Sequence, residues 1–221
     1  MPPKDATSTT TYTDRLEKAK TILKKAGWTT NSDGVLEKKK SKKETVRLEF
    51  SLSTSNLPDL VQTAQLLKEN WEQLGARVNV KVYEIGDLEE NVIRPRKYDC
   101  LLFGEIMGRD PDPFAFWHSS QRNDPGLNIA LYANKTADKL MEEARSLGDT
   151  SQKEEKYRRL QEEIIKDNAA IFLYSPNFIY LLPDQLKGVN AASIITPPER
   201  FSDVYNWYLR TERVWKIFSR D

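Results

Sequence analysis

Hydrophobic residues along this chain follow two different periods. Residues 14–26 and 57–74 carry apolar residues three or four positions apart, which predicts two amphipathic helices. Residues 46–52 and 77–85 alternate apolar with polar positions, which predicts two strands with one buried face each. The apolar positions are Leu16, Ala19, Ile22, Leu23 and Ala26, then Leu60, Val61, Ala64, Leu67, Trp71 and Leu74 in the helices, and Val46, Leu48, Phe50 and Leu52, then Val78, Val80 and Val82 in the strands.

The order strand, helix, strand predicts a βαβ unit with parallel strands and a right-handed crossover. A third strand is predicted at residues 99–103, "DCLLF", which is apolar without alternation, as in a central strand covered on both faces. The loop "FGEIMGRDPDPFAFWHSSQ", residues 103–121, leaves the carboxyl end of that strand. Open α/β sheets bind ligands in the crevice beyond the carboxyl ends of their strands, so this loop is the candidate site.

The second half of the chain predicts two more helices and two more strands. The helices are "TADKLMEEARSLG" and "SQKEEKYRRLQEEIIKDNA", the second opening with Ser151 and Glu154 as a capping box. The stretches "AAIFLYS" and "FIYLL" read as strands. The last 20 or so residues are rich in aromatics and have little periodicity, so they have no predicted packing partner in this chain.

Charge adds little to this picture. The chain has 34 Lys and Arg against 33 Asp and Glu, a net charge of +1, and its one block of a single sign is "EKKKSKKE" at 37–44. Asp33-Gly34 just before it is typical of a hairpin turn, so the lysines are predicted to decorate an exposed connection. We therefore expect no nucleic-acid partner.

The chain has one cysteine, Cys100, which lies in an apolar run and is predicted to be a small buried hydrophobe. No apolar stretch approaches the roughly 18 residues needed to cross a bilayer, and "MPPKDATSTTTY" has no apolar signal core. The chain as written is expected to be soluble, without a signal sequence and without membrane insertion.

Catalysis is a weak alternative. Glu105, Asp110 and Asp112 are carboxylates that a glycoside hydrolase could use, but sequence proximity does not set their separation, and Asp112 is also placed to cap the following helical turn. No nucleophile elbow, phosphate loop or metal-ligand cluster is present, and His118 stands alone, which favours a hydrogen-bonded structural histidine. We therefore predict no enzyme activity, no metal and no cofactor.

These stretches in this order, from "DRLEKAKTILKKAGW" through "YDCLLFG" and "RDPDPFAFW" to "KYRRLQEEIIKDNAAIFLYSP", resemble the C-terminal lobe of the peptide-type (family 5) solute-binding proteins of ABC importers. The resemblance covers residues 12–209. It implies an α/β lobe of the class II periplasmic-binding-protein type, with a mixed, mostly parallel sheet flanked by helices. It also implies a disordered segment at 1–11, a ligand-binding lobe at 12–197, and a tail at 198–221 that returns to a missing N-terminal lobe.

The same resemblance implies a set of ligand-binding residues. In peptide-binding members, an acid shortly before the Asp-Pro step takes the ligand's α-amino group, and an aromatic precedes it. Here those positions hold Met107 and Glu105, so the match fails locally at both. The predicted site residues are Phe103, Gly104, Glu105, Met107, Asp110, Trp117 and Asn128.

The resemblance implies the ligand-capturing lobe of an extracytoplasmic protein, periplasmic or on the outer face of the membrane, that delivers peptides or similar small solutes to an ABC permease. Capture would follow from lobe closure, without chemistry on the ligand. Two alternatives stay open: a freestanding protein-interaction module that uses its exposed tail aromatics, and the carboxylate-dependent hydrolase.

Overall fold

The predicted βαβ unit is present in a computed structural model, which describes residues 11–41, 43–106, 112–177, 179–190, 194 and 196–209. The chain divides into two compact units. The first contains Met1–Glu105 and Phe114–Asn134, and the second contains Ile106–Pro113 and Lys135–Asp221.

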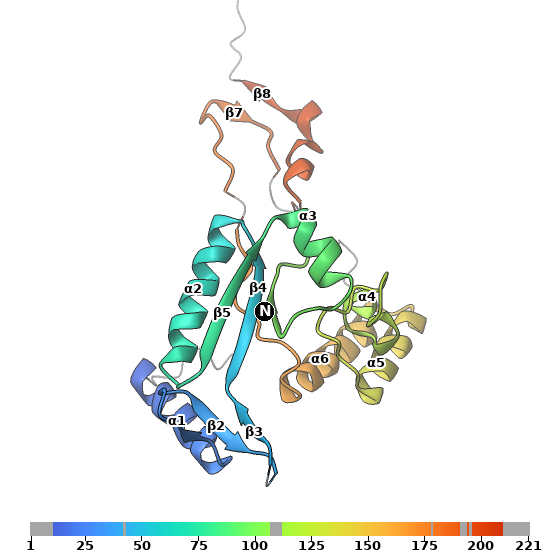
Figure 1. Ribbon diagram of the computed structural model, residues 1–221. Coiled ribbons are helices and arrows are strands. Elements are labelled where there is room, and N and C mark those ends of the chain that lie inside the picture. Colours follow the sequence, from blue (N-terminus) through green and yellow to red (C-terminus); the bar gives the residue numbers. More distant parts are fainter. Residues whose placement is uncertain are drawn as a thin grey trace, which may run out of the picture. The chain divides into compact units, whose positions relative to one another are not determined.

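A parallel three-stranded sheet is the centre of the first unit. Strand β4 (Glu49–Ser55) pairs with β5 (Arg77–Tyr83) on one side and with β6 (Cys100–Leu102) on the other, in the order β5-β4-β6. Helix α2 (Pro58–Glu72) connects β4 to β5 and lies along this strand pair (Figure 1). The predicted helix and the parallel pairing of its flanking strands are therefore confirmed.

Helix α2 covers the sheet with the face that the periodicity predicted. Ala64 is fully buried, and Leu60, Leu67 and Trp71 pack with it against a core that includes Leu52. The rings of Trp71 and Phe50 meet edge to face, with centroids 5.4 Å apart. Large apolar areas from both elements are removed from water here, which stabilises this unit.

Sequence analysis assigned the wrong strand to the centre of the sheet. The apolar stretch containing β6 is an edge strand in the described sheet, and the central strand is β4, in which Ser51–Ser55 are all buried. Hydrogen bonds accommodate two of these polar residues in the central strand: Ser51 Oγ donates to Asp99 at 2.7 Å, and Thr54 Oγ1 donates to the carbonyl of Leu102 at 3.0 Å. The "SLSTS" pattern therefore resembles a half-exposed strand without being one.

The opposite face of the sheet is covered by a π-helical segment, η2 (Leu88–Ile93), which follows the short helix α3 (Ile85–Asp87). Leu88, Val92 and Ile93 form a second apolar cluster. The partly buried residues packed against this cluster are Tyr83, Tyr98, Leu101 and Ile129. Ser53 pairs with Leu101 of β6 and Ser55 pairs with Tyr83 of β5, and side chains of paired residues point to the same face of a sheet. The small serine side chains of β4 therefore face this layer.

A helix and a small antiparallel sheet lie at the end where β4 and β5 begin (Figure 1). Helix α1 (Tyr12–Lys25) leads to β1 (Thr29–Thr30), β2 (Leu36–Lys39) and β3 (Thr45–Arg47). The predicted strand over residues 46–52 is thus broken at Leu48 into β3 and β4. The predicted face of α1 is only half-buried at Leu16, Ala19 and Leu23, and Ile22 is 58% exposed, so this helix contributes no fully buried residue.

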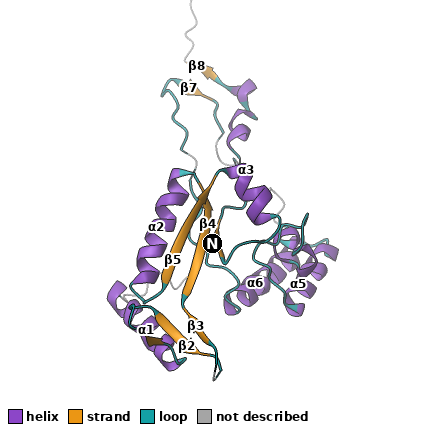
Figure 2. Cartoon of the chain, in the orientation of Figure 1, coloured by secondary structure: helices purple, strands orange, loops and turns teal. Residues whose placement is uncertain are grey.

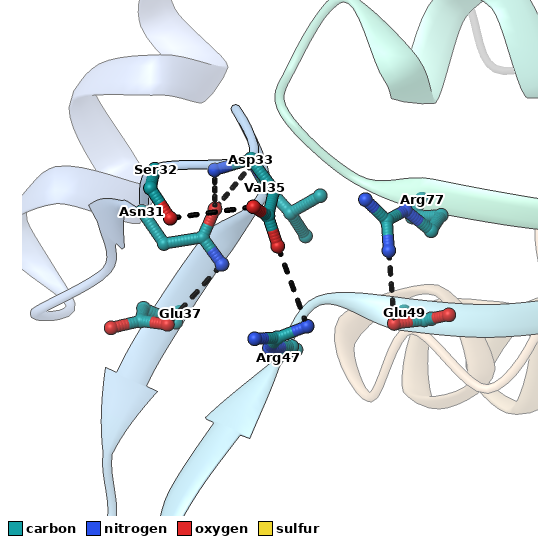
Figure 3. A network of polar contacts seen from close by, with 8 residues as sticks. All are labelled: Asn31, Ser32, Asp33, Val35, Glu37, Arg47, Glu49 and Arg77. Carbon is teal, nitrogen blue, oxygen red and sulfur yellow. Dashed lines mark hydrogen bonds and ion pairs between the residues drawn. The ribbon is translucent and has the colours of Figure 1, made fainter.

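The turn between β1 and β2 is held by one side chain. Asn31 Oδ1 accepts hydrogen bonds from the backbone N–H groups of Asp33 and Val35, and Asn31 Nδ2 donates to Glu37 (Figure 3). Gly34 has a φ of +79°, the left-handed conformation that the predicted Asp-Gly turn requires. The predicted hairpin turn is confirmed.

In the second unit, helices α5 (Lys135–Ser146) and α6 (Thr150–Lys166) pack against each other. Their buried residues are Ala137, Leu140, Met141 and Ala144 in α5 and Leu160 and Ile164 in α6. The predicted capping box of Ser151 and Glu154 is wrong: Asp149 is the N-cap, and its carboxylate accepts from Ser151 N at 2.8 Å. Asp149, two residues before Ser151, fills the same need for an acceptor, because the first N–H groups of a helix have no partner within it.

The strands predicted at "AAIFLYS" and "FIYLL" are absent from residues 169–177 and 179–182, which are loop (Figure 2). A strand needs a neighbour for its backbone hydrogen bonds, and in the described ranges none pairs with these residues. The only strands described in this unit are β7 (Leu186–Lys187) and β8 (Tyr208–Leu209), which pair with each other. Two 3₁₀ segments, Pro197–Phe201 and Val204–Asn206, precede β8, so part of the predicted tail is ordered against residues 186–187.

Candidate functional site

The carboxyl ends of the three parallel strands, at Ser55, Tyr83 and Leu102, lie at the same end of the sheet. We call this end, with residues 103–105 that follow β6, the strand-end site. Asn56 and Glu84 follow the first two strands, and Asn56 Nδ2 donates to Glu84 Oε1 at 3.5 Å. The Ser55 hydroxyl is fully buried and has no hydrogen-bond partner among the described residues. Sequence analysis missed these polar strand ends, although "STSN" and "YE" stand directly at the ends of predicted strands.

Three of the predicted site residues lie together at this end. Phe103 is 37% exposed, and space around Gly104 is open, since a Cβ built there would meet no atom within 4 Å. Glu105 is the only one of the three with a titratable group. Desolvation by surrounding protein raises the pKa of Glu105 to about 7, although its side chain is exposed to solvent. Because water reaches this carboxylate, the shift carries little stability of its own.

We expect the Glu105 carboxyl to titrate near pH 7 in an NMR titration of its side-chain carbon. A raised pKa means that the folded chain holds this proton more tightly than the unfolded chain does. The associated stability is therefore present below the ordinary pKa of 4.5 and is lost as the pH rises through about 7. Glu105→Gln should remove this pH-dependent part, and a midpoint near 4.5 for the wild-type carboxyl would contradict the assignment.

Two further predicted site residues, Met107 and Asp110, lie outside the described residues. Asp112, which was predicted to cap the next helical turn, belongs to the second unit and forms an ion pair with Arg145, with 3.0 Å between Asp112 Oδ2 and Arg145 Nε. The roles predicted for Met107 and Asp110 stay predictions.

Asn128 lies inside the loop that follows helix α4 (Phe114–Trp117) and the 3₁₀ turn Ser119–Gln121. It is fully buried, and its Nδ2 donates to the carbonyls of Trp117, His118 and Tyr132 at 2.9–3.2 Å. Its Oδ1 accepts from Tyr132 N at 3.0 Å. With no exposed surface, Asn128 holds this loop together and has no face left with which to touch a solute.

Trp117 and His118 belong to the loop that the Asn128 hydrogen bonds hold together. Trp117 is half-buried, with its ring 6.1 Å from that of Tyr132 in an edge-to-face arrangement. His118 is 8% exposed, stacks on Phe114 with ring centroids 4.0 Å apart, and its Nδ1 accepts from Ser120 N. The predicted structural, hydrogen-bonded histidine is confirmed.

A second set of contacts ties this loop to the segment between η2 and β6. Arg96 donates to the carbonyls of Ile93, Arg122 and Gly126 at 2.6–3.0 Å, and the Tyr98 hydroxyl donates to the carbonyl of Ile129. Sequence analysis missed these hydrogen bonds, because an isolated arginine that binds carbonyls has no sequence motif. The hydrogen bonds of Arg96, Tyr98 and Asn128 together fix the loop backbone from residue 117 to residue 132.

Gly126 is required by this loop. A Cβ at this position would lie 2.2 Å from the carbonyl oxygen of Gln121, a distance that only a backbone shift could relieve. We expect Gly126→Ala to lower the free energy of unfolding by about 2 kcal/mol, measured by urea denaturation. Gly86→Ala is the control, because nothing lies within 4 Å of its Cβ position and helix α3 favours alanine. Equal stability of the two variants would show that the loop adapts.

Two cavities flank these features in the first unit. One of about 210 Å³ lies between η2 and residues 124–129 and is also lined by Arg96. Another of about 590 Å³ lies between α1, the β1–β2 turn and the end of α2, at the opposite end of the strands from the strand-end site. Among the residues that the structure describes, no group of three His, Cys, Asp or Glu side chains is arranged to hold a metal ion, and no helix is long and apolar enough to cross a membrane.

A parallel α/β sheet covered on both faces, with polar residues at its strand ends, is the architecture expected of a lobe of the periplasmic-binding-protein class. The model of the bacterial extracellular solute-binding proteins, family 5 (middle region), matches residues 1–128. The chain belongs to this family, as its sequence predicted.

Relatives place the chain within the family. It is 33% identical over 199 residues to the oligopeptide-binding protein AppA of Bacillus subtilis, an alignment that covers 87% of this chain and 34% of AppA. The structure of that protein in complex with a nonapeptide matches 88% of this chain and 37% of its own length, with a TM-score of 0.71 and 31% identity. CtaP of Listeria monocytogenes matches with 25% identity, a TM-score of 0.64, and coverage of 88% of this chain and 36% of its own. The chain thus spans about a third of the length of these relatives.

Proposed function

We propose that this chain forms the ligand-capturing lobe of an extracytoplasmic solute-binding protein that delivers peptides or similar small solutes to an ABC importer. The observation that carries the proposal is the strand-end site, which lies where open α/β sheets bind ligands, in a chain that is 33% identical to an oligopeptide-binding protein. In this proposal Phe103, Gly104 and Glu105 line one wall of the binding site. The protein holds its solute by closure and performs no chemistry on it.

Exposed apolar residues in the second unit support a larger assembly. Ile171, Phe172, Ile179 and Leu181 are 65–88% exposed, far more than a chain that buries its own surface would leave. They fall in the stretches that sequence patterns predict as strands. In the proposed two-lobed protein these residues would be paired and buried, and a second lobe would also give this chain's predicted tail a partner.

Mass spectrometry of small molecules released from the natively purified, two-lobed protein would test the solute class. We expect peptides, and because Met107 stands where an acid would bind an α-amino group, N-acetylation of a bound peptide should change its affinity by less than about tenfold. A thioether offers no charge to pair with an ammonium group. Recovery of no peptide, with no binding of added peptides in calorimetry, would overturn the proposed solute class.

The exposed apolar residues also favour a second candidate, a freestanding protein-interaction module. The two candidates differ in solution behaviour. A module should bind a protein partner through its exposed tail aromatics, among them Tyr205 and Tyr208, and bind no small solute. A solute-binding lobe should bind solute once its second lobe is present.

A further inference from the structure

Positive charge is concentrated in one part of the first unit, well away from the strand-end site. Residues 11–47, which include α1 and the β1–β3 sheet, contain 11 Lys or Arg and 5 Asp or Glu, a formal charge of +6. The whole chain carries +1, so the remaining residues carry −5. The near-neutral total therefore hides a strongly polarised chain.

The described lysines of the β2–β3 hairpin, residues 36–47, are exposed and mostly unneutralised. Lys38, Lys39 and Lys43 have no carboxylate within ion-pair distance among the described residues, and Lys40 has only a 3.6 Å contact with Glu44. Lys42 lies outside the described residues. Exposed lysines that repel one another without partners do not stabilise the fold, so the hairpin's own structure does not account for them.

Nearby carboxylates are engaged elsewhere. Asp33 lies 3.7 Å from Arg47, Glu49 lies 3.9 Å from Arg77, and Glu37 accepts from Asn31 (Figure 3). These contacts sit at the base of the hairpin, so the acids compensate the two arginines there and leave the lysines toward the tip.

The end of α1 adds to the same basic region. Lys24 and Lys25 close this helix, and both are exposed. Lys38 crosses over this end, with its Cε 3.8 Å from the Cβ position of Gly27. The terminal carbonyls of the helix do not need these lysines, because Ile22, Leu23 and Lys24 already accept from the backbone N–H groups of Ala26, Trp28 and Gly27.

We propose that the β2–β3 hairpin and the end of α1 form a docking surface for anionic lipid headgroups. Successive side chains of a strand point to opposite faces, so Lys38 and Lys39 place charge on both sides of β2, which suits contact with the headgroups of a flat surface. Residues 38–44 contain no aromatic or large apolar residue, so the attachment is electrostatic and reversible, without burial in the acyl chains. The surface lies at the end where β4 begins, which leaves the opposite strand ends accessible (Figure 1). This inference does not depend on the proposed function.

Co-sedimentation of the 221-residue chain with lipid vesicles tests the proposal. Vesicles of phosphatidylcholine with one third phosphatidylglycerol should bind the chain at low salt, and pure phosphatidylcholine vesicles should not. Replacing four hairpin lysines by glutamine should weaken binding more than about 100-fold, since each lysine near an anionic surface contributes about fivefold. The four changes are Lys38→Gln, Lys39→Gln, Lys40→Gln and Lys43→Gln.

A matched variant removes the same charge elsewhere and should keep most of the binding. Its four changes are Lys97→Gln, Lys135→Gln, Lys139→Gln and Lys166→Gln. Raising the salt concentration to 0.5 M should release the wild-type chain, because exposed charges are then screened over a few ångströms. Equal losses in both variants, or binding that survives high salt or occurs on neutral vesicles, would overturn the proposal.

Discussion

Asn128→Asp should destabilise the first unit by more than about 3 kcal/mol at pH 7. The substitution keeps the shape of the side chain but replaces the donor that contacts three carbonyls with an oxygen. A carboxylate in this fully buried position would face those carbonyls without compensation, or would take up a proton at a cost in free energy. The size of the effect thus measures how much this one amide contributes to the loop.

Urea denaturation followed by tryptophan fluorescence would measure this change. Asn123→Asp is a matched control, because it makes the same chemical change in the same loop on an exposed side chain, and should alter stability by less than about 0.5 kcal/mol. The cost of Asn128→Asp should shrink as the pH falls and the new carboxyl binds a proton. Similar stabilities for the two variants at pH 7 would show that the Asn128 hydrogen bonds do not hold the unit together.

Hydrophobic periodicity correctly predicted the elements whose apolar faces pack against a partner in the same unit. Helix α2 and strand β5 were correctly placed, because each has apolar residues at the spacing of its own structure and meets its partner within the same βαβ unit. The same reasoning placed β4 at the wrong depth. Depth depends on what covers the second face, and Ser51 and Thr54 are buried through hydrogen bonds to residues 48 positions away in the chain.

The strands predicted at 169–182 are absent from the described residues for a different reason. Their composition favours β-structure, but a strand exists only with a neighbour, and in the described part of the chain these residues have none. Sequence patterns report what a segment is suited for, and not whether its partner is in the same chain. Helices α5 and α6 were predicted correctly because their hydrogen bonds are internal and their apolar faces meet each other.

The candidate site was predictable in place more than in detail. The carboxyl end of β6 was found from an apolar run followed by a polar loop, and Phe103, Gly104 and Glu105 do lie there. Asn128, in contrast, was selected through resemblance, and its buried amide supports the loop instead. An asparagine in a loop has the same signature whether its amide faces solute or backbone, so only its surroundings separate the two roles.

We expect the 221-residue chain to bind peptides at least about 100-fold more weakly than a two-lobed protein that contains it, a difference of about 2.8 kcal/mol. Small-molecule sites commonly enclose about 70% or more of their ligand, whereas the strand-end site offers a single wall on which Gly104 opens to solvent. Removing one wall halves the contacts but leaves most of the entropic cost of association, so affinity falls by more than half of its free energy. Closure, which would sequester the solute, requires a second lobe.

Calorimetry on both proteins with the same peptide would measure this difference, with the NMR spectrum of the short chain as evidence that it is folded. Glu105→Gln is the accompanying variant. In the short chain the Glu105 side chain is exposed to solvent, so water screens its interactions with a bound peptide. The substitution should therefore change peptide affinity little in the short chain and several-fold more in the enclosed site. Nanomolar binding by the 221-residue chain would contradict the one-wall account, because it would require a self-contained pocket.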